Sequence, residues 1–169
     1  MARTPSQLEI HRVGVGTDLH RLEPGRPLIL GHIRIPFDRG PLGHSDGDVV
    51  LHALIDAIAG AAGMPDIGEM FPDTDPAYRD ADSAGLLTAA LRELANRGYA
   101  VVNADVTIHA ERPKLSPHKP AIRAEVARLL ELPLDAVSIK AKTNEGVDAV
   151  GRGEAIACTA VVGLHKLSQ

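Results

Sequence analysis

The sequence contains no tryptophan, and only two phenylalanines and two tyrosines among its 169 residues. Apolar residues nevertheless make up 44% of the chain, so the core must be built from Ala, Val, Leu and Ile. This composition is typical of a globular protein and not of a disordered one. The length is that of one compact domain, so we expect a single domain at residues 10–169 after a flexible lead at residues 1–9.

Several protein classes are excluded by what else is missing. Aromatic residues that could stack on bases are scarce, and 18 Lys and Arg residues are scattered along a chain of net charge −4. A nucleic-acid partner is therefore not expected. No apolar run approaches the roughly 20 residues that span a membrane, and the first residues do not resemble a secretory signal. We expect a cytoplasmic protein with no membrane partner.

Cysteine occurs once, at Cys158. A single cysteine cannot form an intrachain disulfide, and it excludes a zinc site made of several thiolates. Any transition-metal site must therefore use histidine and carboxylate side chains.

Strand and helix patterns alternate along the chain. Apolar periodicity predicts strands at residues 11–20, 99–111, 136–142 and 154–165, and helices at residues 44–63, 84–98 and 116–132. A small hairpin or irregular excursion is expected at 22–42, and a long loop at 64–83, which is usually functional. The order predicts an α/β (α+β) two-layer sandwich: a mixed four-stranded sheet, helices on one face and a β-α-β-α-β-β-type core.

The ends of the predicted helices carry recognisable signals. Ser45 or Asp46 is expected to cap the first helix, and Gly63 to end it. Ser83 is expected to cap the second helix, and Pro117 to lie near the first turn of the third.

Asp18 and His20 lie two residues apart on the first predicted strand, so their side chains share one face and could converge on an ion. Taken alone, Asp18 and His20 could instead be a surface pair at the end of a strand that binds no ion. The first helix adds Asp48, His52 and Asp56, spaced four apart with no positive partner. Asp18, His20 and His52 would form a three-ligand site with an open position, as in catalytic zinc centres. Asp48 or Asp56 could then support the ligands.

The residues just before this helix suit a phosphate. His44 and Ser45 lie beside backbone N–H groups that would be free at the positive end of the helix dipole. The alternative is that Ser45 and Asp46 only cap the helix.

Three loop segments add polar groups with open roles. Asp73 and Asp75 lie between prolines and could bind a ligand or form a rigid turn. The loop that carries Lys114 is stiffened by Pro113 and Pro117 and could present backbone groups to a base or a phosphate, or Lys114 could simply be a solvated loop residue. Residues 142–145 follow a strand and could serve phosphate oxygens and a hard cation such as magnesium.

Five segments occur in one order: GTDLHRL, GHSDGDVVLHALIDA, DIGEMFPDTDP, ERPKLSPH and GRGEAIAC. In this order the chain resembles the 2-C-methyl-D-erythritol 2,4-cyclodiphosphate synthase family over residues 12–165. The resemblance implies a lyase of the non-mevalonate isoprenoid pathway that converts 4-diphosphocytidyl-2-C-methyl-D-erythritol 2-phosphate to the cyclic diphosphate and CMP. It also implies a homotrimer with active sites between neighbouring subunits.

The resemblance further implies which residues act. Asp18, His20 and His52 would hold one zinc ion per subunit, and Glu145 would hold magnesium or manganese. His44 and Thr143 match positions that stabilise the transition state. The substrate-binding positions would be Asp18, His20, His44, Ser45, Asp66, Ile67, Gly68, Phe71, Pro72, Asp73, Thr74, Asp75, Ala110, Pro113, Lys114, Leu115, Ser116, Lys142, Thr143, Asn144, Glu145, Ala149 and Arg152. Those at 110–116 and 142–145 would come from the adjacent subunit.

One segment departs from the family pattern. Residues 142–150 read KTNEGVDAV, so Gly146 stands where a lysine is common and Ala149 where an aromatic residue is common. Arg152 and Glu154 match the family, whose members place this segment by the central channel of the trimer.

Two other functions fit the residues alone. A zinc-dependent phosphohydrolase would use the open zinc position for hydroxide, with Asp56 orienting that water. A structural metal would instead hold the subunits of an oligomer together.

The synthase needs no protein nucleophile, since a substrate phosphate oxygen attacks, and its catalysis would come from positioning and charge neutralisation.

Overall fold

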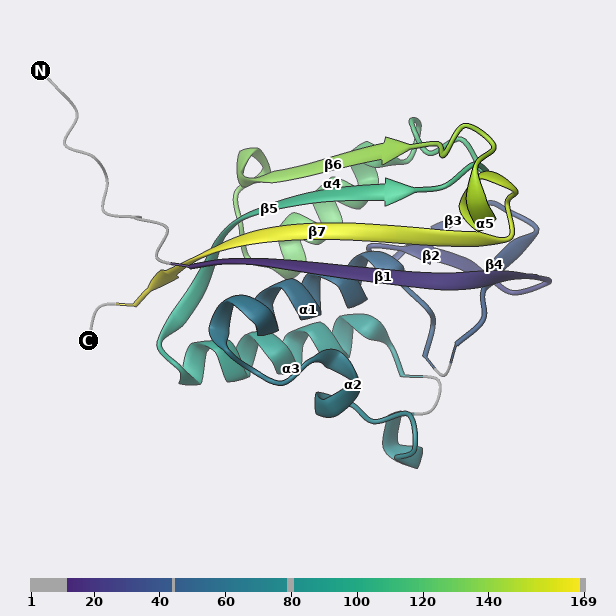
Figure 1. The fold of residues 1–169 in the computed structure, drawn as a ribbon. Coiled ribbons are helices and arrows are strands. Elements are labelled where there is room, and N and C mark those ends of the chain that lie inside the picture. The colour runs from purple at the N-terminus through teal and green to yellow at the C-terminus, as the bar shows by residue number, and fades with distance from the viewer. Residues whose placement is uncertain (1–11, 44, 79–80, 168–169) are drawn as a thin grey trace, which may run out of the picture.

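The computed structural model describes residues 12–43, 45–78 and 81–167 (Figure 1). The predicted lead at residues 1–9 lies outside the described residues. The strands are β1 (Arg12–Pro24), β2 (Leu28–Leu30), β3 (Ile33–Ile35), β4 (Arg39–Pro41), β5 (Tyr99–His109), β6 (Val137–Lys142) and β7 (Ala155–Lys166). The α-helices are α1 (Val49–Ala62), α2 (Ile67–Met70), α3 (Ser83–Asn96), α4 (Lys119–Leu129) and α5 (Asp148–Gly151), and short 3-10 helices cover Pro76–Tyr78 and Leu134–Ala136.

The main sheet has five strands in the order β4-β1-β7-β5-β6. β5 and β6 are parallel, and the other neighbouring pairs are antiparallel, so the predicted mixed sheet is confirmed. The predicted count of four strands is wrong by one, because β4 from the 22–42 excursion pairs with the end of β1. The rest of that excursion forms the predicted hairpin, as β2 and β3.

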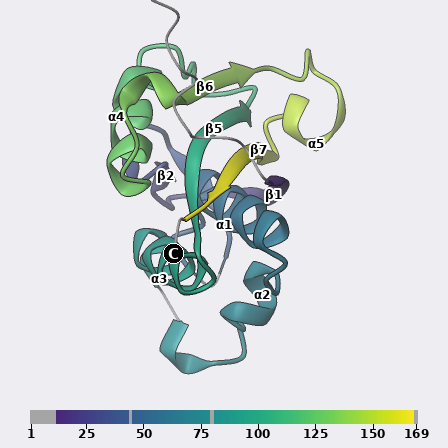
Figure 2. The same cartoon turned by 90° about the vertical axis from the view of Figure 1, so that its left-hand side faces the viewer.

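Helices α1, α3 and α4 lie on one side of the sheet (Figures 1 and 2), which confirms the two-layer arrangement. The core fills the space between the layers. Its largest fully buried side chains include Leu51, Leu54 and Ile58 of α1, Ile108 of β5 and Ile156 of β7. The aliphatic core expected from the scarcity of aromatic residues is therefore observed.

Helix α1 begins later than predicted. Its N-cap is Asp48, whose carboxylate accepts hydrogen bonds from the N–H groups of Val50 and Leu51 at 3.0 and 3.2 Å. The same carboxylate accepts from the N–H groups of Gly31 and His32 in the β2–β3 turn, at 2.9 and 2.6 Å. Asp48 is fully buried, and this burial raises its pKa to about 6 against the opposing effect of these bonds. The carboxylate therefore ties α1 to the hairpin.

The other predicted helix ends differ by a few residues. Gly63 ends α1 in the left-handed conformation, as predicted. The N-cap of α3 is Asp82, so Ser83 is instead its first residue. Helix α4 has Pro120 in its first turn, and Pro117 precedes the helix. The 64–83 segment is not a structureless loop, since it contains α2 and a 3-10 turn.

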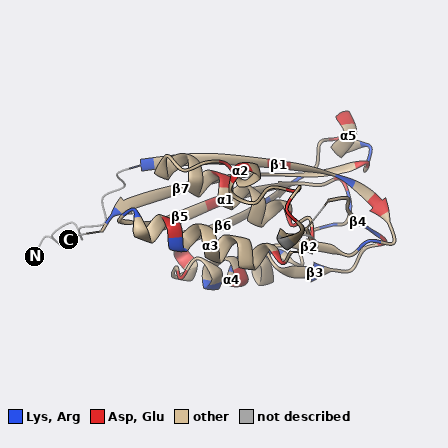
Figure 3. Cartoon of the chain, turned by 90° about the horizontal axis from the view of Figure 1, so that it is seen from below, with Lys and Arg blue, Asp and Glu red and all other residues tan. Residues whose placement is uncertain are grey.

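The face of the sheet that points away from the helices is partly apolar at β1. Val13, Val15 and Leu19 are 65%, 63% and 62% exposed, and Val161 of β7 is 37% exposed. We call these four residues the apolar outer face. The charged residues of β1 are Arg12, Asp18, Arg21 and Glu23, so residues 13–17 of this strand carry no charge (Figure 3). No helix in the described part of the chain is long and apolar enough to cross a membrane.

Candidate metal centre

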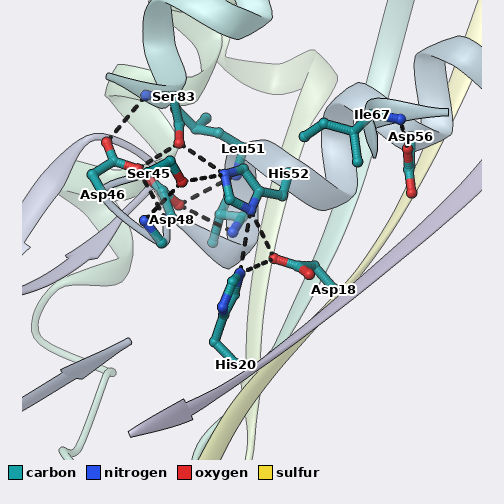
Figure 4. Close-up of polar contacts among 12 residues, drawn as sticks. Asp18, His20, Ser45, Asp46, Asp48, Leu51, His52, Asp56, Ile67 and Ser83 are labelled. Atoms are coloured by element: carbon teal, nitrogen blue, oxygen red, sulfur yellow. Dashed lines mark hydrogen bonds and ion pairs between the residues drawn. The ribbon is translucent and has the colours of Figure 1, made fainter. Parts of the chain in front are cut away.

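Asp18, His20 and His52 lie together at the point where β1 passes α1 (Figure 4). One carboxylate oxygen of Asp18 lies 3.0 Å from His20 Nε2 and 3.0 Å from His52 Nδ1. The two ring nitrogens are 3.4 Å apart. The group offers one ligand atom from each residue, all within 4.8 Å of one another. The simple surface pair considered for Asp18 and His20 is therefore excluded by His52.

Local structure explains this convergence. Alternation along β1 turns Asp18 and His20 toward the helix layer, on the same side as Gly14 and Gly16, which pack against α1. His52 lies in the first turn of α1, where its N–H donates to the Asp48 carbonyl at 3.0 Å. The capped start of α1 thus sets where the histidine meets the strand.

Each histidine uses its other ring nitrogen for a second contact. His20 Nδ1 lies 2.9 Å from the Leu42 carbonyl oxygen, to which it donates. His52 Nε2 lies 2.9 Å from Ser83 Oγ and 3.2 Å from Ser45 Oγ. Protons on these outer nitrogens would leave His20 Nε2 and His52 Nδ1 available to a metal, whereas without a metal the same two nitrogens can donate to the Asp18 carboxylate, which only accepts.

The donor set fits a zinc ion. One carboxylate and two imidazoles are common zinc ligands, and three protein ligands leave a fourth position open. A partner on the outer nitrogen of each ligating histidine is the usual arrangement around metals.

The protonation of the group reflects its contacts. Burial acts to raise the pKa of Asp18, but hydrogen bonds and charge attraction from His20 and His52 outweigh it and hold that pKa well below its usual range. The hydrogen bond to Asp18 raises the pKa of His20, against the opposing effect of burial. A proton and a metal therefore compete for His20 Nε2, so that metal binding there weakens as the pH falls.

The predicted supporting residues are not the observed ones. The Asp48 carboxylate accepts a hydrogen bond from Gly31 in the β2–β3 turn, and Asp56 accepts one from the Ile67 N–H at 2.8 Å. Both aspartates therefore stabilise the fold around α1. Ser83, considered only as a helix cap, contacts His52 instead. Its position 31 residues along the chain from His52 left no spacing signal that could have revealed this contact.

The N–H groups at the start of α1, which were expected to be free for a phosphate, are bonded within the chain. The Asp48 carboxylate occupies the N–H groups of Val50 and Leu51. Ser45 instead accepts from the Gly47 N–H at 3.1 Å. His44 lies outside the described residues.

A pocket of about 390 Å³ opens over the metal-ligand group. It contains several predicted substrate-binding residues together with Gly43, Tyr78 and Leu86, which were not predicted. Its lining is Asp18, His20, Gly43, Ser45, His52, Ile67, Gly68, Phe71, Asp73, Tyr78 and Leu86. We call it the metal-side pocket.

Other predicted residues of this region do not line the metal-side pocket. Asp66 caps α2, accepting from the Glu69 N–H at 2.9 Å. Thr74 and Asp75 are exposed, and Pro72 is half-buried. Phe71 makes an edge contact with Tyr78, with ring centres 5.4 Å apart, so these two rings form one wall of the pocket.

A second pocket, of about 370 Å³, lies where β5 and β6 end. It brings together the two segments that the resemblance assigns to the adjacent subunit. Its lining is Ala110, Glu111, Pro113, Lys114, Leu115, Ser116, Ala141, Lys142 and Thr143. We call it the edge pocket.

The altered segment after β6 forms a tight turn beyond this pocket. Thr143 Oγ1 donates to Glu145 at 2.8 Å, and Asn144 donates to Asp148 at 2.9 Å. The Asp148 carboxylate also accepts from the N–H groups of Val150 and Gly151 at 2.8 and 3.2 Å. The turn is thus stabilised within the chain. Glu145 is exposed, Ala149 is half-buried, and Arg152 is exposed and paired with Glu154 at 2.9 Å.

The two pockets are separate within one chain. The metal-ligand group belongs to β1 and α1, whereas the edge pocket lies at β5 and β6, and β7 and β5 separate β1 from β6 in the sheet (Figure 1). A ligand that used both pockets would need a second copy of the chain to bring them together.

Comparison with known proteins agrees with the resemblance. A family model described as the YgbB family matches residues 11–165. The chloroplastic 2-C-methyl-D-erythritol 2,4-cyclodiphosphate synthase of Catharanthus roseus is 52% identical over 161 residues, which cover 95% of this chain and 68% of that protein. The synthase of Burkholderia mallei (strain SAVP1) is 54% identical over 145 residues, covering 86% of this chain and 90% of that protein.

Solved structures agree with these relatives. A 2C-methyl-D-erythritol-2,4-cyclodiphosphate synthase in a CDP-bound form aligns with a TM-score of 0.85 and 44% identity, covering 91% of this chain and 100% of that chain. The bifunctional IspDF of Campylobacter jejuni aligns with a TM-score of 0.89 and 38% identity over 93% of this chain, which spans 42% of that longer protein. This chain therefore belongs to the YgbB family, the family of the 2-C-methyl-D-erythritol 2,4-cyclodiphosphate synthases.

Proposed function

We propose that this chain is a 2-C-methyl-D-erythritol 2,4-cyclodiphosphate synthase, a phosphorus-oxygen lyase of the non-mevalonate isoprenoid pathway. A 2-phosphate oxygen of 4-diphosphocytidyl-2-C-methyl-D-erythritol 2-phosphate attacks the β-phosphorus. The bond between that phosphorus and the oxygen bridging to CMP breaks, and CMP leaves with the bridging oxygen. The products are the cyclic diphosphate and CMP.

One observation carries this proposal: Asp18, His20 and His52 converge beneath a pocket in a chain whose family relatives carry the synthase name. The CDP-bound relative supports a cytidine nucleotide as part of the substrate. The alternative phosphohydrolase is less well supported, because Asp56, its candidate for orienting water, is bonded to Ile67.

The metal-side pocket would hold the reacting phosphates. Asp18, His20 and His52 would bind one zinc ion per subunit, and Glu145 of a neighbouring subunit would bind magnesium or manganese. When bound, these ions would supply Lewis acidity and neutralise phosphate charge. Ser45 would orient a phosphate of the substrate, and Gly68 with Asp73 would contact the methylerythritol unit and its flanking groups.

The remaining roles belong to residues that the family pattern assigns. His44 and Thr143 would stabilise the transition state by hydrogen bonding to oxygens that gain charge as the bond to CMP breaks. The edge pocket would hold the cytidine, with Lys114 beside its base or phosphate. Because substrate phosphate is already largely ionised above its second pKa of about 6, no side chain needs to act as a strong base.

The assembly that joins the two pockets would be a homotrimer. The apolar outer face supports burial against other copies, since large exposed apolar patches commonly mark interfaces. The number three follows from the family resemblance, and a cytoplasmic location remains part of the prediction.

The reaction is tested by incubating the purified protein with the cytidyl substrate, zinc and magnesium. We expect CMP and a product whose phosphorus NMR spectrum shows two coupled signals, because the cyclic diphosphate keeps its P–O–P linkage. Release of free phosphate would instead indicate hydrolysis and contradict the synthase. Omitting the substrate 2-phosphate is the matched control, since it removes the attacking group and should prevent CMP release.

The trimer is tested by native mass spectrometry, in which we expect three times the 17.9 kDa chain mass. Val15→Asp places a charge on the apolar outer face and is expected to release monomers, because burying an unpaired charge is strongly unfavourable. We expect the monomers to lose synthase activity but still to bind zinc, because Asp18, His20 and His52 all belong to one chain. Leu134→Asp is the control, since Leu134 is exposed in a 3-10 turn away from this face. A monomeric wild-type protein with full activity would contradict shared active sites.

A further inference from the structure

The outer nitrogen of His52 contacts a serine that no part of the proposed reaction uses. His52 Nε2 lies 2.9 Å from Ser83 Oγ, and Ser83 is fully buried at the start of α3. Figure 4 shows His52 between this serine on one side and Asp18 with His20 on the other. The inner nitrogen therefore faces the metal-ligand group, while the outer nitrogen faces Ser83 and, at the longer distance of 3.2 Å, Ser45 Oγ.

The bonds around Ser83 have a definite direction. Ser83 Oγ donates a short hydrogen bond to a carboxylate oxygen of Asp46, which can only accept. The Ser83 N–H donates to the other Asp46 oxygen at 3.1 Å. Because the serine proton is committed to Asp46, Ser83 Oγ has only lone pairs left for His52, and it accepts from the Nε2–H.

Asp46 is itself held in place. Its carboxylate accepts from the Asp48 N–H at 3.2 Å, and its own N–H donates to the Ala81 carbonyl at 3.3 Å. The carboxylate is thus positioned by both the start of α1 and the segment before α3. A rigid acceptor of this kind constrains the serine hydroxyl, and through it the imidazole.

We propose that Ser83 and Asp46 are positioning residues that fix the tautomer and ring orientation of His52 for metal binding. The chain His52 Nε2–H to Ser83 to Asp46 keeps the proton on Nε2 and leaves Nδ1 as the ligand atom. This inference rests on the metal site of the proposed function and extends it to two residues outside the ligand set. Partners of this kind typically contribute 10- to 100-fold to metal affinity or activity.

The same pair connects the substrate segment to the ligand helix. The segment before α3 supplies four residues to the metal-side pocket: Ile67, Gly68, Phe71 and Asp73. Helix α3 follows this segment and begins at Ser83. At the other end of the segment, the Ile67 N–H is bonded to Asp56 of α1. The hydrogen bonds that hold the wall of the pocket and those that orient His52 therefore lie at the two ends of the same segment.

The first test compares zinc affinities by competition with a chromophoric chelator, starting from metal-free protein. Ser83→Ala and Asp46→Asn are each expected to bind zinc about 10- to 100-fold more weakly than wild type. Ser138→Ala is the matched control, because Ser138 is exposed on β6 at the opposite side of the sheet, and its zinc affinity should equal that of wild type. Ser83→Thr retains the hydroxyl and should restore most of the affinity.

The second test needs no variant of Ser83 and therefore does not depend on its folding. Long-range proton–nitrogen NMR of the zinc-loaded wild type reports which ring nitrogen of each histidine keeps its proton, and the His52→Ala spectrum assigns His52. The zinc-loaded form is used because without metal the Asp18 carboxylate also accepts from His52 Nδ1. We expect the Nε2–H form, and the Nδ1–H form would overturn the proposal. Unchanged zinc affinity in both Ser83→Ala and Asp46→Asn would also overturn it.

These outcomes separate the inference from the reaction. A wild type that forms the cyclic product, with the Nδ1–H form at His52, overturns the positioning role alone. A wild type that forms no cyclic product, with weakened zinc binding in both variants and the Nε2–H form, overturns the synthase and supports the positioning role. A wild type that binds no zinc overturns both.

Discussion

Replacing His52 by alanine is expected to remove zinc binding and CMP release together. His52 supplies one of the three converging ligand atoms, 3.0 Å from the Asp18 carboxylate and 3.4 Å from His20 Nε2. Its loss leaves two ligands from a single strand. Two ligands cannot enforce the tetrahedral geometry that zinc prefers, so the affinity should fall by more than the roughly 100-fold that a supporting partner contributes at most.

The activity should fall with the metal, because the proposed reaction joins two anionic groups and depends on charge neutralisation. Zinc content is measured by elemental analysis, and CMP release by chromatography at saturating substrate. His165→Ala is the matched control: His165 lies near the far end of β7, whereas Asp18 pairs with Cys158 nearer its start. That control should keep its zinc.

Folding must be shown to survive the change. His52 is nearly buried, at 9% exposure, so the unfolding transition of the variant should be measured alongside its metal content. A folded, zinc-free His52→Ala protein that releases CMP at the normal rate would contradict the metal-dependent mechanism.

Replacing Gly16 by alanine is expected to destabilise the fold by about 3 kcal/mol, because overpacking typically costs about 1–3 kcal/mol and the added methyl group here meets backbone atoms. A Cβ at this position would lie 2.1 Å from the Ala53 carbonyl oxygen and 2.5 Å from the Ala57 nitrogen. These are helix backbone atoms that cannot rotate away. Strand β1 and helix α1 would have to separate, which would also move His52 away from Asp18.

The effect is measured by chemical denaturation, as a fall in the midpoint with an unchanged slope. Gly60→Ala is the matched control, since it adds the same methyl group at an exposed position of helix α1, where the nearest atom lies 4.0 Å away. That change should be neutral or stabilise by up to about 1 kcal/mol, because alanine favours helix. Equal stabilities of the two variants would show that β1 and α1 are not in the close contact described.

Much of the fold follows from local patterns. The long strands at β1, β5 and β7 and the helices α1 and α3 have strong periodicity, so their existence and order were predicted correctly. Strand β4 was missed because three residues, Arg39–Pro41, are too few to show a period. The caps were misplaced because Ser45, Asp46 and Asp48 can all cap a helix in isolation, and the hairpin at Gly31 selects Asp48 by adding two more bonds.

The candidate site was likewise predicted from the sequence only in part. Alternation along a strand by itself determined that Asp18 and His20 share a face, and the composition determined that a metal must be held by histidine and carboxylate. Helical spacing placed Asp48, His52 and Asp56 on one stripe, and His52 was predicted as the third ligand with an aspartate in support. Only the tertiary structure decided that the two aspartates instead hold the hairpin and α2. It also brought Ser83 to His52, because contacts between residues far apart in the chain depend on how strands and helices pack.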